Sequence, residues 1–127
     1  MFNFLTLLSA ILFVVIDFVY LNLIKNYFKN QIEMIQKSPM KINMFGAVLC
    51  YILLVFALNY FIIQPKRSVF DAFVLGILIY GVYETTSYSL FTKWSFLTVI
   101  IDTLWGGILF ALTTFIISQI RKLTGKK

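Results

Sequence analysis

Three acidic residues, Asp17, Glu84 and Asp102, lie inside long apolar stretches of this sequence that contain no lysine, arginine or histidine. The chain has five acidic residues in all, so more than half of them lie in apolar stretches. At the centre of a membrane helix an acidic side chain costs about 2.5–3.5 kcal/mol on insertion scales, and ionisable residues there commonly mark a site. These three acids are therefore the first candidates for functional residues.

Polar and aromatic side chains accompany the acids at helical spacing. Around Glu84, the spacing i, i+3, i+4, i+7, i+8 predicts one helix face that carries Tyr80, Tyr83, Glu84, Ser87 and Tyr88. Asp17 aligns with Tyr20 on its own segment, and Asp102 aligns with Trp105. Tyrosine and tryptophan donate hydrogen bonds to carboxylates and offer aromatic faces to ammonium groups. The predicted ligand- or proton-binding residues are Asp17, Tyr20, Tyr80, Tyr83, Glu84, Ser87, Asp102 and Trp105.

The chemistry of such a group follows from the lack of a neighbouring cation. Carboxylates that lie close together in a low dielectric cannot all stay ionised, so either some are protonated or a cation is bound. The alternative interpretation is structural. Each acid would accept a hydrogen bond from a neighbouring tyrosine, threonine or tryptophan and so lock the helices together.

Other kinds of site have little support in the sequence. There is no histidine, which leaves no ordinary zinc site and no histidine-based catalytic triad. No glycine-rich phosphate loop or metal-ligand spacing occurs, and no serine or threonine is paired with a candidate base. We expect no metal, no cofactor and no catalytic residue, and an enzyme is the less favoured class.

The elements that position these residues are membrane spans. Hydrophobic residues make up 61% of the chain and charged residues 13%, whereas soluble domains carry about 25% charge. Four segments reach the ~20 residues needed to cross a bilayer, at about 2–24, 44–63, 69–91 and 94–120. We predict an all-α, multi-pass integral membrane protein in which residues 1–127 form one domain, an up-down bundle of four transmembrane helices. Its short connections fall at 64–68 and 92–93, and Trp94 fits an interfacial anchor.

The connection between the first two spans has its own pattern. Charged residues recur there every four positions, at Lys25, Lys29, Glu33, Lys37 and Lys41. Apolar residues fall mainly on the opposite face. This pattern predicts that helix one continues into a short amphipathic helix lying on the membrane surface and ending before Pro39. A solvated loop is the alternative.

The net charge of +6 comes from eleven lysines and arginines, all between or beyond the apolar stretches. That distribution is typical of membrane flanks that face anionic lipid headgroups, so the bilayer is the expected partner and nucleic acid is not. The two membrane orientations collect nearly equal positive charge on either side, and the choice between them stays open.

Topology brings the three acids to a common depth. We call side A the side of the connections 25–43 and 92–93, and side B the opposite side. Asp17, Glu84 and Asp102 each lie about 6–8 Å from the membrane midplane, at 1.5 Å of rise per residue, and all towards side A. This predicts one shared pocket walled by helices one, three and four, with Gly106 and Gly107 permitting close helix approach.

Two segments carry a recognisable pattern, Tyr80-Gly-Val-Tyr-Glu-Thr-Thr-Ser87 followed by Trp94-Ser95, and Asp102-Thr-Leu-Trp-Gly106. They resemble the signatures of the DUF2177 family of small predicted membrane proteins, whose third helix typically reads Y-x-x-Y-D-x-T-N, then W-S, and whose fourth reads D-x-x-W-G. The family's D-x-x-W-L resembles Asp17-Phe-Val-Tyr-Leu21. Three departures are Glu84 for Asp, Ser87 for Asn and Tyr20 for Trp. The resemblance implies a four-helix membrane fold and points to the same acids, and it implies no reaction.

The leading functional hypothesis is transport or binding of protons, or of a small cationic or polar solute, at an intramembrane carboxylate pocket. Because four helices make a thin wall, a conducting path would require a homodimer. Two alternatives stay open. One is a membrane-embedded enzyme acting on a lipid or isoprenoid substrate, with an acid as general base and a tyrosine as proton donor. The other is a structural subunit whose acids pair with basic groups of a partner helix.

Overall fold

Four long helices make up the fold of this computed structural model, which describes residues 4–37 and 43–124. The helices are α1 (Phe4–Gln36), α2 (Met44–Leu58), α3 (Val69–Leu90) and α4 (Phe96–Thr124), and α2 continues into a short π-helical segment, η1 (Asn59–Ile63). All four helical segments are long and apolar enough to cross a membrane. The described residues form no strand. The predicted all-α class and the four spans are confirmed.

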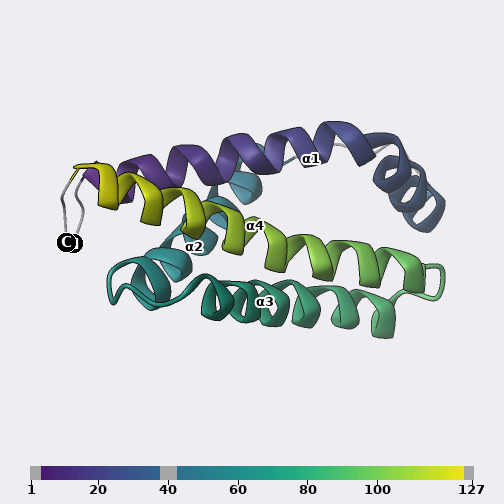
Figure 1. Cartoon of the computed structure of the whole chain (residues 1–127). Coiled ribbons are helices and arrows are strands. Elements are labelled where there is room, and N and C mark those ends of the chain that lie inside the picture. Colours follow the sequence, from purple (N-terminus) through teal and green to yellow (C-terminus); the bar gives the residue numbers. More distant parts are fainter. Residues whose placement is uncertain (1–3, 38–42, 125–127) are drawn as a thin grey trace.

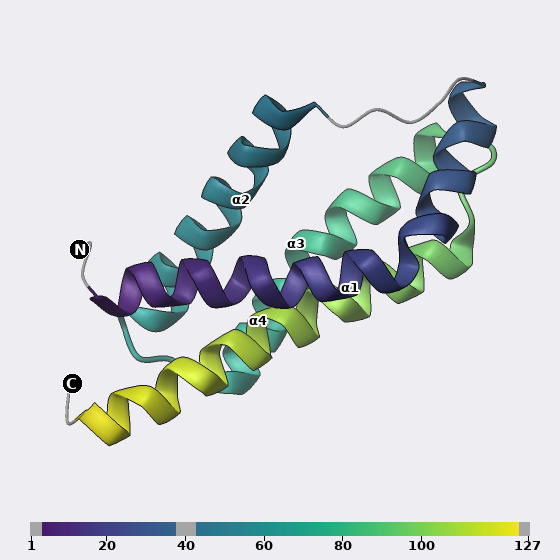
Figure 2. The same ribbon diagram turned by 90° about the horizontal axis from the view of Figure 1, so that it is seen from above.

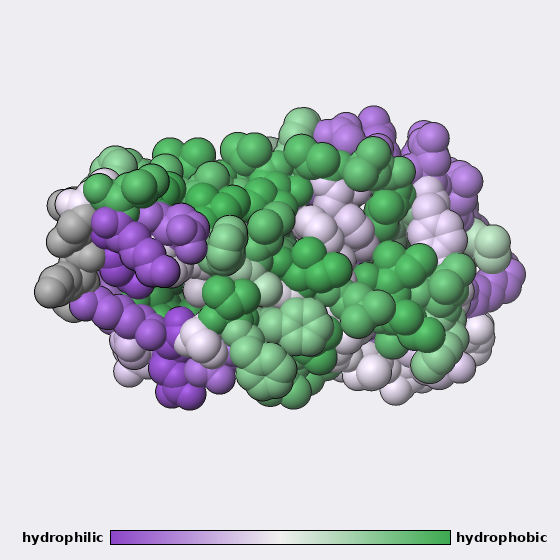
Figure 3. Space-filling model, viewed as in Figure 1, coloured by the Kyte–Doolittle hydropathy of each residue, from purple (hydrophilic) through white to green (hydrophobic). Residues whose placement is uncertain are grey.

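The helices run up and down, so Phe4 and Thr124 lie at the same end of the bundle, which is side B (Figure 1). Large apolar side chains are exposed along all four helices. On the face drawn in Figure 3, hydrophobic residues cover the middle and hydrophilic residues gather towards the two ends. This is the surface that a bilayer solvates, because lipid tails accept apolar side chains that water would exclude.

The helix α1 is longer than its predicted span of 2–24. Its 33 residues include the lysine-bearing segment, so helix one continues through this segment as predicted, and the segment is the last part of α1. Figure 2 shows this last part turning away from the direction of the first. The helix ends at Gln36, where Lys37 adopts a positive φ of 58°. Pro39 lies outside the described residues, and the position of this segment on a membrane surface stays a prediction.

The helices α3 and α4 form the closest pair in the fold and lie side by side in both ribbon views (Figures 1 and 2). Gly76 faces Gly106 and Gly107, and a Cβ built at Gly76 would lie 2.9 Å from the Gly107 Cα. Only glycine permits two helix backbones to approach this closely. The predicted role of Gly106 and Gly107 is confirmed, and Gly76 completes the contact.

The helix α1 packs over α4 with one face turned inward. Its buried residues Leu5, Ser9, Phe13 and Asp17 recur every four positions. The second span approaches the others at the end of α2 and in η1, where Leu58, Asn59, Ile62 and Ile63 are buried, whereas no residue of 44–57 is (Figure 2). The core of the bundle is therefore built mainly on α4, which contributes the most buried residues.

The connection between η1 and α3 matches its sequence signals, whereas the connection between α3 and α4 is longer than the predicted 92–93. The residues Gln64–Ser68 join η1 to α3, and the Ser68 Oγ accepts a hydrogen bond from the Asp71 backbone N–H at 3.0 Å. Arg67 forms an exposed ion pair with Asp71 at 2.8 Å, one turn along the helix. The helix α4 begins at Phe96, so Trp94 lies in the turn between α3 and α4 rather than at the start of a span.

Candidate functional site

Asp17 is held by two aromatic donors from two other helices. The Trp105 Nε1 on α4 donates a hydrogen bond to its Oδ1 at 2.8 Å. The Tyr51 hydroxyl on α2 donates a hydrogen bond to its Oδ2. The Asp17 side chain itself is buried, at 6% exposure. The predicted wall of helices one, three and four therefore omitted α2, which also contributes a hydrogen-bond donor to Asp17.

Asp102 is joined to the Asp17 site through Tyr20. The Tyr20 hydroxyl donates a hydrogen bond to the Asp102 Oδ1 at 3.2 Å. The Tyr20 ring stacks on the Trp105 indole, with ring centroids 4.3 Å apart and planes 4° from parallel. The stacked pair therefore brings a donor to Asp102 and a donor to Asp17 into direct contact.

Glu84 on α3 is the most deeply buried of the acids, at 1% exposure. The Trp94 Nε1 donates a hydrogen bond to its Oε1 at 2.9 Å. Its Oε2 is buried and has no hydrogen-bond donor in the described part of the chain. The carboxyl groups of Glu84 and Asp102 lie close enough to interact. We call Asp17, Glu84 and Asp102 together the acid cluster.

The acid cluster is electrostatically unbalanced. No described lysine or arginine hydrogen-bonds or ion-pairs with any of its three acids, and the side chains that donate hydrogen bonds to them are neutral phenol and indole groups. Neighbouring carboxylates in a low dielectric share protons, because two adjacent negative charges without a cation repel strongly. The arrangement can thus hold one or more protons, or a cation in their place.

Two of the remaining predicted residues, Tyr80 and Ser87, lie on the same side of α3 as Glu84. Ser87 is buried, and Tyr80 packs its ring against Gly106 and against Phe110. Tyr83 does not join them, since it is 63% exposed. The helix α3 packs mainly on α4, and its buried stripe is narrow and runs through Ala72, Gly76, Glu84 and Ser87, which excludes the neighbouring position 83.

Two side chains that donate hydrogen bonds to the acid cluster were not among the residues predicted from the sequence. Trp94 fits an interfacial anchor by position, but it is buried at 9% exposure and bonds Glu84, ten residues earlier. Tyr51 is visible in the second span, but nothing in the spacing links it to Asp17, 34 residues away. The sequence did contain one signal for Trp94, because Trp94-Ser95 is part of the family pattern that follows the third helix.

On side A of the acid cluster, the last part of α1 is tied to the start of α4 by polar side chains. The buried Gln31 accepts hydrogen bonds through its Oε1 from the Ser95 backbone N–H and from the Thr98 Oγ1, both at 3.0 Å. Tyr27 shares a hydrogen bond of 2.8 Å with the Thr98 hydroxyl. A polar interior thus continues from the acids towards side A.

On side B of the acid cluster, the interior becomes apolar. Phe13, one turn before Asp17 on α1, meets Phe110 edge to face, with centroids 5.4 Å apart, and both are fully buried with Leu58 and Leu109. Beyond this layer, the buried Asn59 donates a hydrogen bond to the Ser9 Oγ at 3.0 Å. The apolar layer therefore separates the acids from the next polar contact.

Comparisons with known proteins agree with this architecture. A family model described as a predicted membrane protein, DUF2177, matches residues 2–118, which contain all four spans up to the last turns of α4. A search of curated proteins and a search of solved structures gave no match. The matched range covers the acids and every aromatic donor that bonds them. The chain belongs to the DUF2177 family of predicted membrane proteins.

Proposed function

We propose that this membrane protein binds protons, or a small cationic or polar solute in exchange for them, at the acid cluster, and that it passes them across the bilayer. The chemistry is reversible protonation of carboxyl groups within a membrane span, where ionisable residues commonly form proton relays. Asp102 and Glu84 are the exchanging pair. Asp17 is the neighbouring acid, coupled to Asp102 through the Tyr20–Trp105 stack.

The observation that carries the proposal is the buried Oε2 of Glu84. This oxygen has no donor in the described part of the chain, although its partner Oε1 is bonded to Trp94. An unsatisfied buried acceptor costs about 1–3 kcal/mol, and more when it belongs to a charged group. A proton shared with the adjacent Asp102 carboxyl removes that penalty, because it supplies the missing donor.

The surroundings of the acid cluster support exchange with side A. Hydroxyl and amide groups of Tyr27, Gln31 and Thr98 lie in that direction, whereas Phe13 and Phe110 close the opposite direction. Protons move along hydrogen-bonding groups and not through packed aromatic rings. A passage to side B would therefore require the Phe13–Phe110 layer to open, or a second copy of the chain to supply the other half of the path.

The same hydrogen bonds favour one competing role. Each acid accepts a bond from an aromatic donor on another helix or turn, and such contacts hold transmembrane helices together. In that case the acids act as structural ties and exchange no proton. The two roles differ in one measurable respect, which is whether a neutral amide at the same position abolishes proton movement in a protein that still folds.

Proton flux in liposomes provides the test. The purified chain is reconstituted in potassium-loaded liposomes with a pH-sensitive dye inside. Valinomycin then lets potassium leave, which makes the lumen electrically negative and draws protons inward. We expect the wild type to acidify the lumen and Asp102→Asn to abolish this flux. Asp71→Asn is the matched control, because it makes the same chemical change at a partly exposed acid outside the acid cluster.

A second readout separates binding from passage. Infrared difference spectra of the wild type should contain a protonated-carboxyl band at neutral pH, and that band should shift or vanish in Glu84→Gln. Undiminished flux through a folded variant that carries Asp17→Asn, Glu84→Gln and Asp102→Asn would overturn the proposal. The absence of any protonated-carboxyl band in the wild type would favour the structural role instead.

A further inference from the structure

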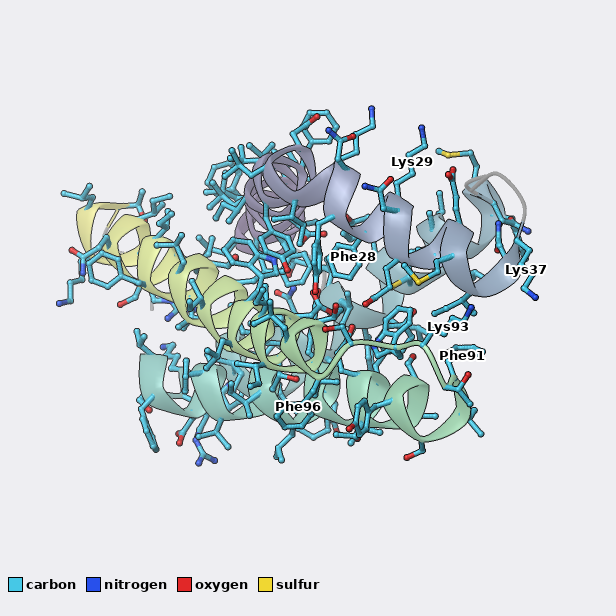
Figure 4. The ribbon with its side chains drawn as sticks, turned by 90° about the vertical axis from the view of Figure 1, so that its right-hand side faces the viewer. Phe28, Lys29, Lys37, Phe91, Lys93 and Phe96 are labelled. Atoms are coloured by element: carbon cyan, nitrogen blue, oxygen red, sulfur yellow. The ribbon has the colours of Figure 1, made fainter. Side chains whose placement is uncertain are left out.

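A groove opens at side A between the end of α1 and the turn that joins α3 to α4. It has a volume of about 290 Å³ and is lined by Met34, Ile35, Lys37, Leu90, Phe91, Thr92 and Lys93. Figure 4, which views the molecule from this end, shows Lys37 on one wall and Phe91 and Lys93 on the other. The groove is separate from the acid cluster and shares no residue with it.

The walls of the groove are fixed by hydrogen bonds. Gln31, about two turns before Lys37, holds the end of α1 against Ser95 and Thr98, which follow the other wall in the sequence, at 3.0 Å in each case. The Trp94 backbone N–H donates to the Phe91 carbonyl oxygen at 3.2 Å within the turn. The groove is therefore a shaped feature of the fold, since both of its walls are anchored to the start of α4.

The lining of the groove combines positive charge with apolar surface. Among the residues that the structure describes, two lysines line it and no acidic side chain does. Leu90 is 72% exposed and Phe91 43% exposed, so both present apolar surface. The turn with Lys93 joins two membrane spans, which sets the groove at the boundary between hydrocarbon and water. At that depth the abundant anion is the lipid phosphate.

We propose that this groove binds one anionic phospholipid. The phosphate contacts the ammonium groups of Lys37 and Lys93, and an acyl chain lies along Leu90 and Phe91. Lysine binds phosphate as a point charge with several donors, and juxtamembrane lysines attract anionic headgroups. The apolar side chains explain why a lipid fits better than a free phosphate, which would leave them without a partner.

Native mass spectrometry of the full chain, released from detergent with defined lipid, tests this proposal. We expect the wild type to retain one phosphatidylglycerol and to retain phosphatidylcholine much less. The variant with Lys37→Gln and Lys93→Gln should bind phosphatidylglycerol about 25-fold more weakly, since each lysine near an anionic surface contributes roughly fivefold. Lys66→Gln with Lys122→Gln is the matched control, which removes the same charge from exposed positions near side B.

Three results on lipid retention would overturn the assignment. They are unchanged phosphatidylglycerol binding by the Lys37 and Lys93 variant, an equal loss in the Lys66 and Lys122 control, and equal retention of phosphatidylcholine by the wild type. Glycerophosphate, which has the headgroup chemistry without acyl chains, should compete poorly. If it displaces the lipid fully at similar concentration, the groove is a free-phosphate site instead. All four lysines are exposed, so the variants should fold.

Discussion

Replacing Gly76 by alanine should force apart α3 and α4, the most closely packed helices of the fold. The new Cβ would lie 2.7 Å from the Gly106 carbonyl carbon and 2.9 Å from the Gly107 Cα, with the Gly106 oxygen closer still. Ordinary contacts of a Cβ begin near 3.4 Å. All three atoms belong to the backbone, so no side chain can rotate away and the helices themselves must shift.

The size of the effect follows from two opposing contributions. Overpacking against rigid neighbours costs about 1–3 kcal/mol, and contact with backbone atoms favours the upper end. Alanine regains up to about 1 kcal/mol of helix propensity over glycine. The expected net loss in the free energy of unfolding is therefore about 2 kcal/mol, or roughly 30-fold in the folding equilibrium. Because Glu84 lies two turns further along α3, the displacement should also disturb its contact with Asp102.

Unfolding titrations in mixed micelles with sodium dodecyl sulfate, followed by far-ultraviolet circular dichroism, measure this loss. Gly81→Ala is the matched control on the same helix, since its Cβ would meet only the Thr103 side chain, at 3.5 Å. That control should be as stable as the wild type or slightly more stable. Equal stability of Gly76→Ala and the wild type, or an equal loss in the control, would refute the packing described for α3 and α4.

Two further predictions concern buried hydrogen bonds. Trp94→Phe keeps an aromatic ring but removes the donor to Glu84. Unfolding titrations should show that the free energy of unfolding falls by about 1–3 kcal/mol, the usual effect of leaving a buried acceptor unsatisfied. A stability equal to that of the wild type would mean that the bond contributes nothing. Gln31→Leu removes the hydrogen bonds that join α1 to α4. Amide hydrogen exchange, measured by mass spectrometry, should become faster over residues 25–36 and stay unchanged in α3. Unaltered protection of residues 25–36 would show that another contact holds them.

The spans and the three acids were predictable from the sequence because the bilayer imposes simple rules. A helix must carry about 20 apolar residues to cross, and an acid within it stands out against that background. The alternation of four passes then set the side towards which each acid lies. Glycines at positions 106 and 107 were a further signal, since small residues mark close helix contacts.

The partners of those acids were not predictable by the same rules. Helical spacing groups Tyr83 with Glu84, but the rotation of α3 against α4 exposes Tyr83, and hydropathy carries no information on that rotation. Trp94 has the position of a headgroup anchor, yet the tightness of its turn folds the indole back onto Glu84. Which helices become neighbours decides such contacts, and that choice depends on the packing of the whole bundle.

The hydrogen bonds of Asp17 have a consequence for how the chain is made. Its two donors, Tyr51 and Trp105, lie 34 and 88 residues later in the sequence. Chains fold from the N-terminus as they are synthesised, so α1 enters the membrane while its acid has neither donor. The emergence of α2 supplies the first, and Asp17 is fully satisfied only when α4 arrives. Glu84, by contrast, receives its donor from the next turn of the same hairpin. During biogenesis, the first helix therefore carries an acid that obtains its second hydrogen-bond donor only when the last helix is inserted.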